Sequence, residues 1–131
     1  MLVDAESRMR ILIVDDEEMI RELIHVTLSQ DPRFEVFQAS SGESAVEATR
    51  TLEPALVLLD VRMPGIDGVE ACEQIRAEHG AERPTIIMIT ALGESDDIQR
   101  ALDAGANDYF IKPFSPRAVL SRVYELFDLA A

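Results

Sequence analysis

The stretch ALVLLDVRMPGIDG, residues 55–68, decides the fold of this chain. Its first five residues, 55–59, are small or apolar without interruption, which is typical of a strand buried on both faces of a parallel sheet. An acidic residue, Asp60, follows at once, and Pro64 and Gly65 prevent the strand from continuing. Asp60 is therefore expected at the carboxyl end of a central strand, where open α/β sheets bind their ligands.

Strand and helix patterns alternate outward from this stretch along the whole chain. Each strand pattern is followed by apolar residues at helical spacing. Such alternation requires right-handed crossovers and gives a parallel sheet with helices on both faces. We expect a flavodoxin-like, doubly wound α/β fold with five parallel strands in the order 2-1-3-4-5. The predicted strands cover residues 10–14, 34–37, 55–59, 84–89 and 108–111.

Capping residues predict where four of the helices begin. A Ser or Asp followed three residues later by Glu forms a capping box, and Pro suits the first helical position. The predicted capping residues are Ser40 with Glu43, Asp67 with Glu70, Ser95 alone, and Ser115 followed by Pro116.

Length and composition indicate a single domain. The chain has 131 residues, 47% of them hydrophobic, which is enough for one core. We assign the domain to residues 10–129, after a polar lead of residues 1–9. The single cysteine, Cys72, excludes an internal disulfide and is typical of a reducing compartment, and no apolar run approaches the roughly 20 residues of a membrane span. We therefore expect a cytoplasmic protein.

The net charge and the residue composition of the chain limit the kinds of ligand that it can bind. A net charge of -13 argues against direct binding of nucleic acid, because contact with a phosphate backbone needs clustered Lys and Arg. No Cys/His cluster offers a zinc site, so metal ligands must be oxygens. Any role on nucleic acid would need another domain.

Polar side chains stand at the carboxyl ends of four predicted strands, and the expected fold brings those ends together. They are Asp15 and Asp16, Asp60, Thr90 and Lys112. Two carboxylates about 4 Å apart repel by about 4 kcal/mol at an effective dielectric constant of about 20. Lys112 supplies one compensating charge, and Mg2+ suits carboxylate oxygens. Because the same cation would neutralise a phosphoryl group, the sequence predicts a phosphoryl site with a carboxylate nucleophile.

At these residues the chain closely resembles the receiver domains of bacterial two-component response regulators. The resemblance covers about residues 9–129 and includes LLDVRMPGIDG at 58–68. It implies that Asp60 accepts a phosphoryl group, with Mg2+ present, from the phosphohistidine of a sensor histidine kinase or a histidine phosphotransferase. Asp16 and Asp60 would bind the ion through their side chains, Asp15 through water, and Arg62 through its backbone carbonyl.

The resemblance also assigns the remaining site residues. Thr90 would hydrogen-bond a phosphoryl oxygen and Lys112 would pair with another. Tyr109 would be the switch aromatic that turns inward when Thr90 moves, and the bond between Lys112 and Pro113 would be cis, an isomer accessible to X-Pro bonds. Taken singly, Thr90, Tyr109 and Lys112 would each be an ordinary surface or strand-end residue, and only their joint spacing indicates a site.

The implied activity is that of a switch rather than an enzyme. The domain would catalyse only its own phosphorylation and a slow autodephosphorylation, and would signal by a population shift of the face formed by the fourth helix, the fifth strand and the fifth helix. That face would meet a downstream protein or an output domain, as a monomer or as a phosphorylation-dependent dimer. Arg62 and Leu92 occupy positions that vary in the family and influence phosphoryl lifetime, so the lifetime stays open.

Three alternatives are distinguishable in the sequence. A haloacid-dehalogenase-type phosphatase needs a second aspartate two residues after the nucleophile, where this chain has Arg62. A flavodoxin-type FMN binder needs a Ser-, Thr- or Gly-rich phosphate loop where this chain has acids at 15–18. Within the receiver family, residues 105–123 resemble receivers joined to winged-helix DNA-binding domains, so the chain is a single-domain regulator, a phosphorelay intermediate or the excised receiver of a longer transcriptional regulator. The sequence names neither the kinase and stimulus nor the output target.

Overall fold

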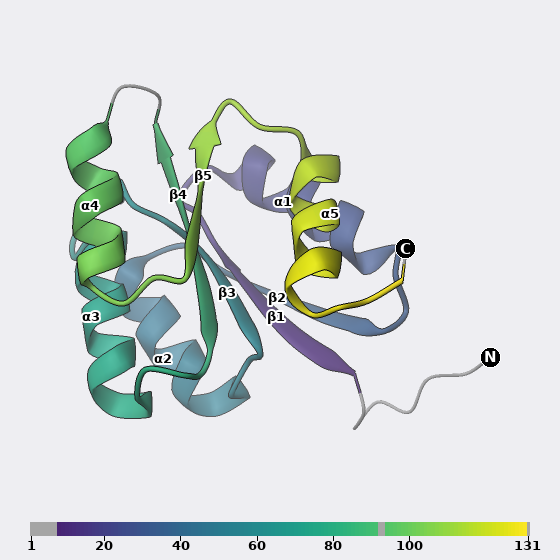
Figure 1. Ribbon diagram of the computed structural model, residues 1–131, viewed down its shortest axis with the longest axis horizontal. Helices are drawn as coiled ribbons and strands as arrows, with labels where there is room; N and C mark the ends of the chain where they lie inside the picture. The colour runs from purple at the N-terminus through teal and green to yellow at the C-terminus, as the bar shows by residue number, and fades with distance from the viewer. Residues whose placement is uncertain (1–7, 92–93, 131) are drawn as a thin grey trace.

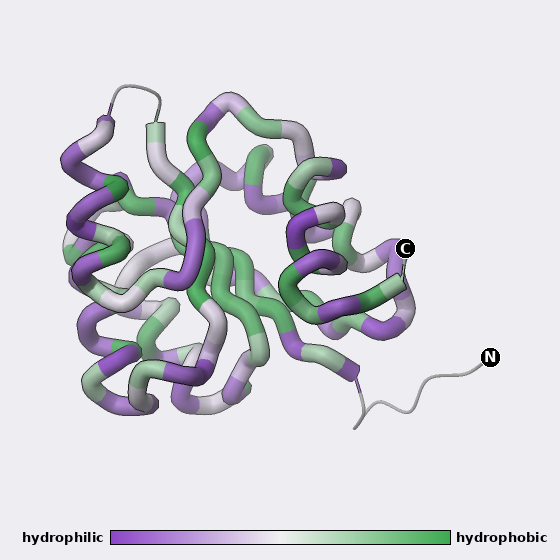
Figure 2. Tube along the Cα trace, in the orientation of Figure 1, coloured by the Kyte–Doolittle hydropathy of each residue, from purple (hydrophilic) through white to green (hydrophobic). Residues whose placement is uncertain are grey.

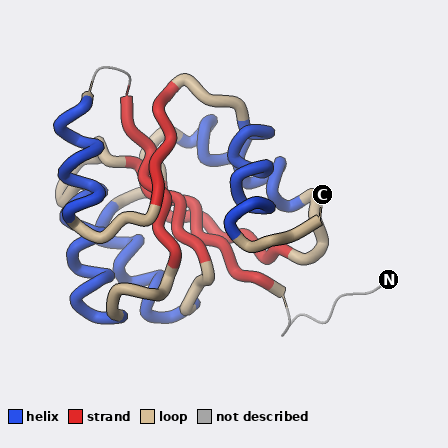
Figure 3. The backbone as a smooth tube through the Cα atoms, viewed as in Figure 1, coloured by secondary structure: helices blue, strands red, loops and turns tan. Residues whose placement is uncertain are grey.

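The computed structural model describes residues 8–91 and 94–130, in which five strands alternate with five helices (Figures 1 and 3). This alternation is the one that the hydrophobic pattern predicts. In chain order the elements are β1 (Met9–Val14), α1 (Glu18–Ser29), β2 (Phe34–Ala39), α2 (Gly42–Leu52), β3 (Leu56–Asp60), α3 (Gly68–His79), β4 (Thr85–Ala91), α4 (Ser95–Asp103), β5 (Asp108–Lys112) and α5 (Pro116–Leu126).

The strands form one parallel sheet in the order β2-β1-β3-β4-β5, which confirms the predicted topology. Helices α1 and α5 cover one face of the sheet, and α2, α3 and α4 cover the other (Figure 1). β3 lies in the middle, where Leu58 pairs with Ile13 of β1 and Ile87 of β4. Because the strands are parallel, all five carboxyl ends lie along one edge of the sheet.

The core follows from the uninterrupted apolar strands, which appear as hydrophobic segments at the centre of Figure 2. Alternate residues of each strand point to opposite faces. Leu56 and Leu58 pack with α1 and α5, whereas Val57 and Leu59 pack with α2, α3 and α4. All four side chains are fully buried, so β3 is fixed from both sides up to Asp60.

Two of the four predicted helix starts are confirmed. Asp67 caps α3 in a reciprocal box with Glu70. Ser115 caps α5, with Pro116 in the first turn. Each cap satisfies a backbone N–H that would otherwise have no partner within the helix.

The other two predicted starts are wrong. The cap of α2 is Ser41, whose hydroxyl accepts from the backbone N–H of Ser44 at 3.0 Å, rather than Ser40 with Glu43. Glu43 instead accepts a hydrogen bond from the backbone N–H of Ile66. At α4, Ser95 lies inside the first turn, and the cap position is Glu94, which makes no side-chain capping bond.

The strands differ from their predicted bounds by one or two residues. β1 begins at Met9, β2 continues to Ala39, and β4 runs from Thr85 to Ala91. Ladder pairing extends the strands beyond the strictly apolar runs, because the backbone bonds do not depend on side-chain polarity. None of the described helices is long and apolar enough to cross a membrane.

Candidate functional site

An acidic cluster lies at the carboxyl edge of the sheet, between the ends of β1 and β3. Asp60 is the last residue of β3 and is 3% exposed, and Asp15, directly after β1, is fully buried. Asp16 is exposed to solvent. One carboxylate oxygen from each of the three lies within 4.8 Å of the others, so the structure brings together the three acids that the sequence singles out.

Lys112, at the end of β5, reaches into this cluster. Its Nζ lies 3.4 Å from Asp60 Oδ2, 3.7 Å from Asp15 Oδ2 and 3.5 Å from Glu17 Oε1. Glu17 is a contact that the sequence did not identify. One ammonium group facing three carboxylates leaves the site with an excess of negative charge.

The electrostatics of the two buried acids follow from this excess. Burial raises the pKa of Asp60 to about 7, Asp15 adds to the rise, and Lys112 opposes it. Burial also raises the pKa of Asp15, although the backbone N–H of Glu17 donates to its Oδ1 at 2.8 Å and opposes the rise. Burial disfavours the charge of Lys112, but attraction by Asp60 and Asp15 outweighs it, so the pKa of Lys112 is raised.

Two buried oxygens at this site have no hydrogen-bond partner among the described residues. They are Asp15 Oδ2 and Thr90 Oγ1. Thr90 is 2% exposed near the end of β4, next to Ala91, which pairs with Lys112 of β5. Buried polar atoms normally have partners, so two unpartnered oxygens at one edge indicate a site shaped for something that binds there.

The donor set suits a hard cation. Three carboxylates in mutual reach, one of them with an unpartnered buried oxygen, are ligands that Mg2+ or Ca2+ accepts. A bound cation would also offset the repulsion that raises the pKa of Asp60. The site is therefore an acidic pocket able to hold a metal ion.

The loop after Asp60 closes tightly over the end of β3. A Cβ atom on Gly68 would overlap the backbone carbonyl of Asp60, and Gly68 N–H donates to the carbonyl of Val61. Gly65 has a φ of 77°, which favours glycine. Glu43 of α2 holds the backbone of Ile66. These contacts fix the backbone of the residues that follow the candidate acceptor.

The side chain of Arg62 makes contacts that the sequence did not predict. From the sequence, the backbone carbonyl of Arg62 was expected to bind the metal, and its position was expected to influence the phosphoryl lifetime. Its guanidinium pairs with Asp97 and Glu94 at the start of α4. Asp97 is almost fully buried and did not stand out in the sequence, because it lies 35 residues from Arg62. No local pattern could have revealed this contact.

The remaining predicted residues lie as follows. Tyr109 is 36% exposed on the edge strand β5. The peptide bond between Lys112 and Pro113 is cis. Leu92 lies outside the described residues.

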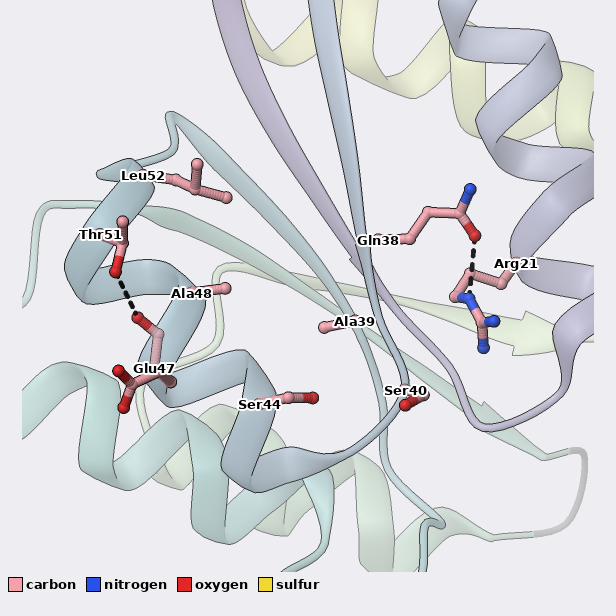
Figure 4. A pocket seen from close by; sticks show the side chains of 9 residues that line it. All are labelled: Arg21, Gln38, Ala39, Ser40, Ser44, Glu47, Ala48, Thr51 and Leu52. Carbon is pink, nitrogen blue, oxygen red and sulfur yellow. Dashed lines mark hydrogen bonds between the residues drawn. The ribbon is translucent and has the colours of Figure 1, made fainter.

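Two hollows near the site differ in character. An apolar groove of about 410 Å³ between α1 and the segment after β5 is lined by Ile20, Leu23, Ile24, Lys112, Pro113, Phe114 and Pro116. A second hollow, of about 520 Å³, lies between α1, β2 and α2 and contains none of the cluster residues (Figure 4). Arg21 in this second hollow donates to Gln38 at 2.9 Å. The hollow contains no group of acids that could hold a metal ion among the described residues.

Comparisons with known proteins agree with this geometry. The family model described as the response regulator receiver domain matches residues 11–124. The chain is 39% identical over 98% of its length to "Transcriptional regulatory protein ResD" of Bacillus subtilis (strain 168), and 38% identical over 88% of its length to "DNA-binding response regulator MtrA" of Mycobacterium tuberculosis (strain ATCC 25618 / H37Rv). It covers 52% and 49% of those proteins, so the chain spans about half the length of the curated relatives it matches.

Solved structures show the same fold. A putative response regulator from Chloroflexus aurantiacus J-10-fl is similar with a TM-score of 0.83 and 34% identity, covering 92% of this chain and 98% of that one. A CheY-like receiver domain protein from Methanospirillum hungatei JF-1 gives a TM-score of 0.85 at 29% identity, covering 93% and 95%. Together with the fold and the acidic pocket, these matches show that the chain belongs to the response regulator receiver domain family of two-component systems.

Proposed function

We propose that Asp60 is the phosphoacceptor of this receiver domain. The observation that carries the proposal is the position of Asp60, a buried carboxylate at the end of the central strand and 3.4 Å from the Lys112 ammonium. Asp15 and Asp16 lie beside it and are less suited, because Asp15 is farther from the Lys112 ammonium, at 3.7 Å, and no ion pair joins Lys112 to Asp16 among the described residues.

In the proposed reaction, a carboxylate oxygen of Asp60 attacks the phosphorus of a phosphohistidine. The new O–P bond forms as the N–P bond breaks, and the electron pair of the N–P bond stays on the ring nitrogen. The imidazole leaves as the neutral base when its other nitrogen is already protonated, and otherwise takes a proton from water. Lys112 pairs with one phosphoryl oxygen and the hydroxyl of Thr90 donates to another. Thr90 Oγ1 has no hydrogen-bond partner among residues 8–91 and 94–130, which supports this assignment because the hydroxyl can bond to an incoming group.

We propose that the metal is Mg2+, which Asp16 and Asp60 would hold through their side chains, Asp15 through water and Arg62 through its backbone carbonyl. When bound, the ion supplies positive charge that neutralises phosphoryl oxygens during transfer. The fixed loop after Asp60 supports a role for Arg62, because the backbone there is held by α2 and by Gly68.

The output surface is proposed to be the face of α4, β5 and α5. These three elements carry four exposed large apolar side chains, Leu102, Tyr109, Ile111 and Leu126. A Thr90 that moves toward a phosphoryl group leaves space for Tyr109 to turn inward, which would change this face. The domain thus acts as a switch and not as an enzyme with turnover of an outside substrate.

A second proposal concerns the protein as a whole. The relatives are named as transcriptional and DNA-binding regulators, and the chain covers about half of each. This favours the alternative that the chain is the receiver of a longer DNA-binding regulator, whose output domain contacts nucleic acid while this domain does not. The phosphoryl donor would be a sensor histidine kinase or a histidine phosphotransferase in the cytoplasm.

The test is the intact mass of the protein after exposure to acetyl phosphate and, separately, to phosphoramidate, whose P–N bond resembles that of phosphohistidine. Wild type is expected to gain one phosphoryl group only when Mg2+ is present. Asp60→Asn is expected to gain none, and Asp96→Asn, which changes an exposed acid on α4, serves as the control. Undiminished labelling of Asp60→Asn would move the acceptor elsewhere. Size-exclusion chromatography of the same samples reports whether phosphorylation produces a dimer.

A further inference from the structure

An ion-pair cluster connects the residue two places after Asp60 with helix α4. The guanidinium of Arg62 contacts Asp97 at two points, with Nε 2.8 Å from Oδ2 and Nη2 3.1 Å from Oδ1. The same Nη2 lies 3.3 Å from Glu94 Oε2. A two-point contact between guanidinium and carboxylate fixes direction as well as distance, which a single contact does not.

Asp97 is built into the fold and is not an incidental surface partner. It is 1% exposed, in the first turn of α4, and also accepts from Arg100 Nη1 at 3.1 Å. A buried carboxylate is costly unless it is paired and hydrogen-bonded, so Asp97 depends on these two arginines. Its neighbour Asp96 is exposed and makes no side-chain hydrogen bond or ion pair with the residues that the structure describes.

The cluster holds the loop after Asp60 at both of its ends. Arg62 lies at the start of that loop. At the end of the loop lies Asp67, the N-cap of α3, and its Oδ2 is 3.1 Å from Arg100 Nη2. α4 therefore contacts both ends of the loop, through Asp97 at the start and Arg100 at the end. A displacement of α4 would therefore disturb the contacts of the Arg62 guanidinium with Asp97 and Glu94.

We infer that Asp97 is a positioning residue for the phosphoryl site and acts through Arg62. This inference rests on the proposed function, in which the backbone carbonyl of Arg62 is a metal ligand. By holding the Arg62 side chain, Asp97 keeps that carbonyl oriented and couples metal affinity at the site to the position of α4. Coupling of this kind is reciprocal, so metal binding also steadies the first turn of α4.

The test measures Mg2+ affinity by titration of intrinsic tyrosine fluorescence or by calorimetry, together with the rate of labelling by acetyl phosphate. Asp97→Asn is expected to weaken Mg2+ binding and to slow labelling by about threefold each, a size typical of coupling between groups in contact. Asp96→Asn removes the same charge from the same turn and is the matched control, expected to stay near wild type. Equal values for the two variants would overturn the inference.

A double-variant cycle separates positioning from general loss of structure. Arg62→Gln is expected to reproduce the effect of Asp97→Asn, and the double variant should be no worse than either single one. Effects that add in full would show that Asp97 acts independently of Arg62 and would also overturn the inference. If Asp97→Asn does not fold, Arg62→Lys, at a side chain 61% exposed, keeps the charge but loses the two-point contact and should give the same loss.

Failure of this inference is distinguishable from failure of the proposed function. If wild type gains a phosphoryl group that Asp60→Asn does not, the acceptor assignment stands whatever Asp97→Asn shows. If Asp60→Asn is labelled as wild type is, the acceptor assignment fails first. Hydrogen exchange of α4 gives a readout besides labelling: Mg2+ should protect its first turn in wild type and not in Asp97→Asn.

Discussion

Two buried carboxylates at opposite edges of the sheet, Asp60 and Asp31, have opposite electrostatic character. Asp60 is the last residue of β3, at the carboxyl edge, and burial together with Asp15 raises its pKa to about 7. Asp31 lies in the turn before β2, at the amino edge, and hydrogen bonds from Arg33 hold its pKa far below its usual range. Both side chains are at least nine-tenths buried, so burial alone does not decide the direction of the shift.

At Asp31 the hydrogen-bond partners outweigh the effect of burial on the pKa, whereas at Asp60 burial prevails and Asp15 adds to it. Asp31 accepts from Arg33 Nη2 at 2.6 Å, from the backbone N–H of Arg33 at 2.9 Å and from the hydroxyl of Tyr124 at 2.9 Å. Asp60 has one ammonium at 3.4 Å and faces a second buried carboxylate. A carboxylate with its lone pairs satisfied stabilises the fold, whereas one opposed by like charge costs stability and is available to bind a cation or a phosphoryl group.

The largest expected effect on stability is at Asp31. Asp31→Asn should lower the free energy of unfolding by about 2 kcal/mol at pH 7, because Arg33 and Tyr124 lose a charged acceptor. Since the folded-state pKa is depressed, this contribution is present above the unfolded value near 4 and is lost as the pH falls through the folded value. Urea unfolding at pH 7 and pH 3 should therefore show a smaller difference at pH 3.

Tyr124→Phe provides the graded control for this site. It removes one hydrogen bond to Asp31 and keeps the ring that packs against Phe34, so a loss of about 1 kcal/mol is expected. A loss as large as that of Asp31→Asn would show that the phenol, and not Arg33, is the main partner.

The next largest effect is an increase in stability, and it is expected at Asp60. Without metal, Asp60→Asn should raise the free energy of unfolding by about 1 to 2 kcal/mol at pH 8, because it removes a buried charge that burial disfavours and Asp15 repels. With a raised folded-state pKa, protonation stabilises wild type below the unfolded value near 4, and that stability is lost as the pH rises through about 7. The advantage of the variant should thus grow from pH 4 to pH 7. An advantage that is the same at pH 5 and pH 8 would contradict a raised pKa.

The smallest effect is expected at Asp16, which shares the cluster but not the burial. Metal-free Asp16→Asn should be more stable than wild type by less than about 1 kcal/mol, because solvent screens its charge. The same change should weaken Mg2+ binding, which calorimetry measures directly. Equal or lower stability of the variant in metal-free denaturation would show that crowding of the acids does not cost stability.

The fold and the acids of the cluster were predictable because they depend on local patterns and general topology. Residues 55–59 are apolar on both faces, so they can only lie in a covered strand, and alternation with helices leaves a parallel sheet. The acids come directly after such strands, so parallel pairing alone brings Asp15, Asp16 and Asp60 to one edge. The roles assigned to individual site residues stay predictions.

The sequence pattern predicted the wrong helix cap where two neighbouring residues were equally able to cap the helix. Ser40 and Ser41 can both cap a helix, and the choice of Ser41 depends on Ser44 and on Ile66, which engages Glu43 from another loop. At α4 the cap residue Glu94 makes no side-chain capping bond, and the first turn instead carries Asp97, which accepts from Arg62.

The sequence by itself determined the strand order, the helices on both faces and the edge at which the acids meet. Only the tertiary structure decided which buried carboxylate has hydrogen-bond partners and which faces a like charge. Tyr124 donates to Asp31 across 93 residues of sequence, and Arg62 donates to Asp97 across 35. Hydrophobic periodicity is a property of consecutive residues, so it can be read from the sequence alone. The pKa and the role of a carboxylate depend on charges a few ångströms away in space, and these are set only when the chain has packed.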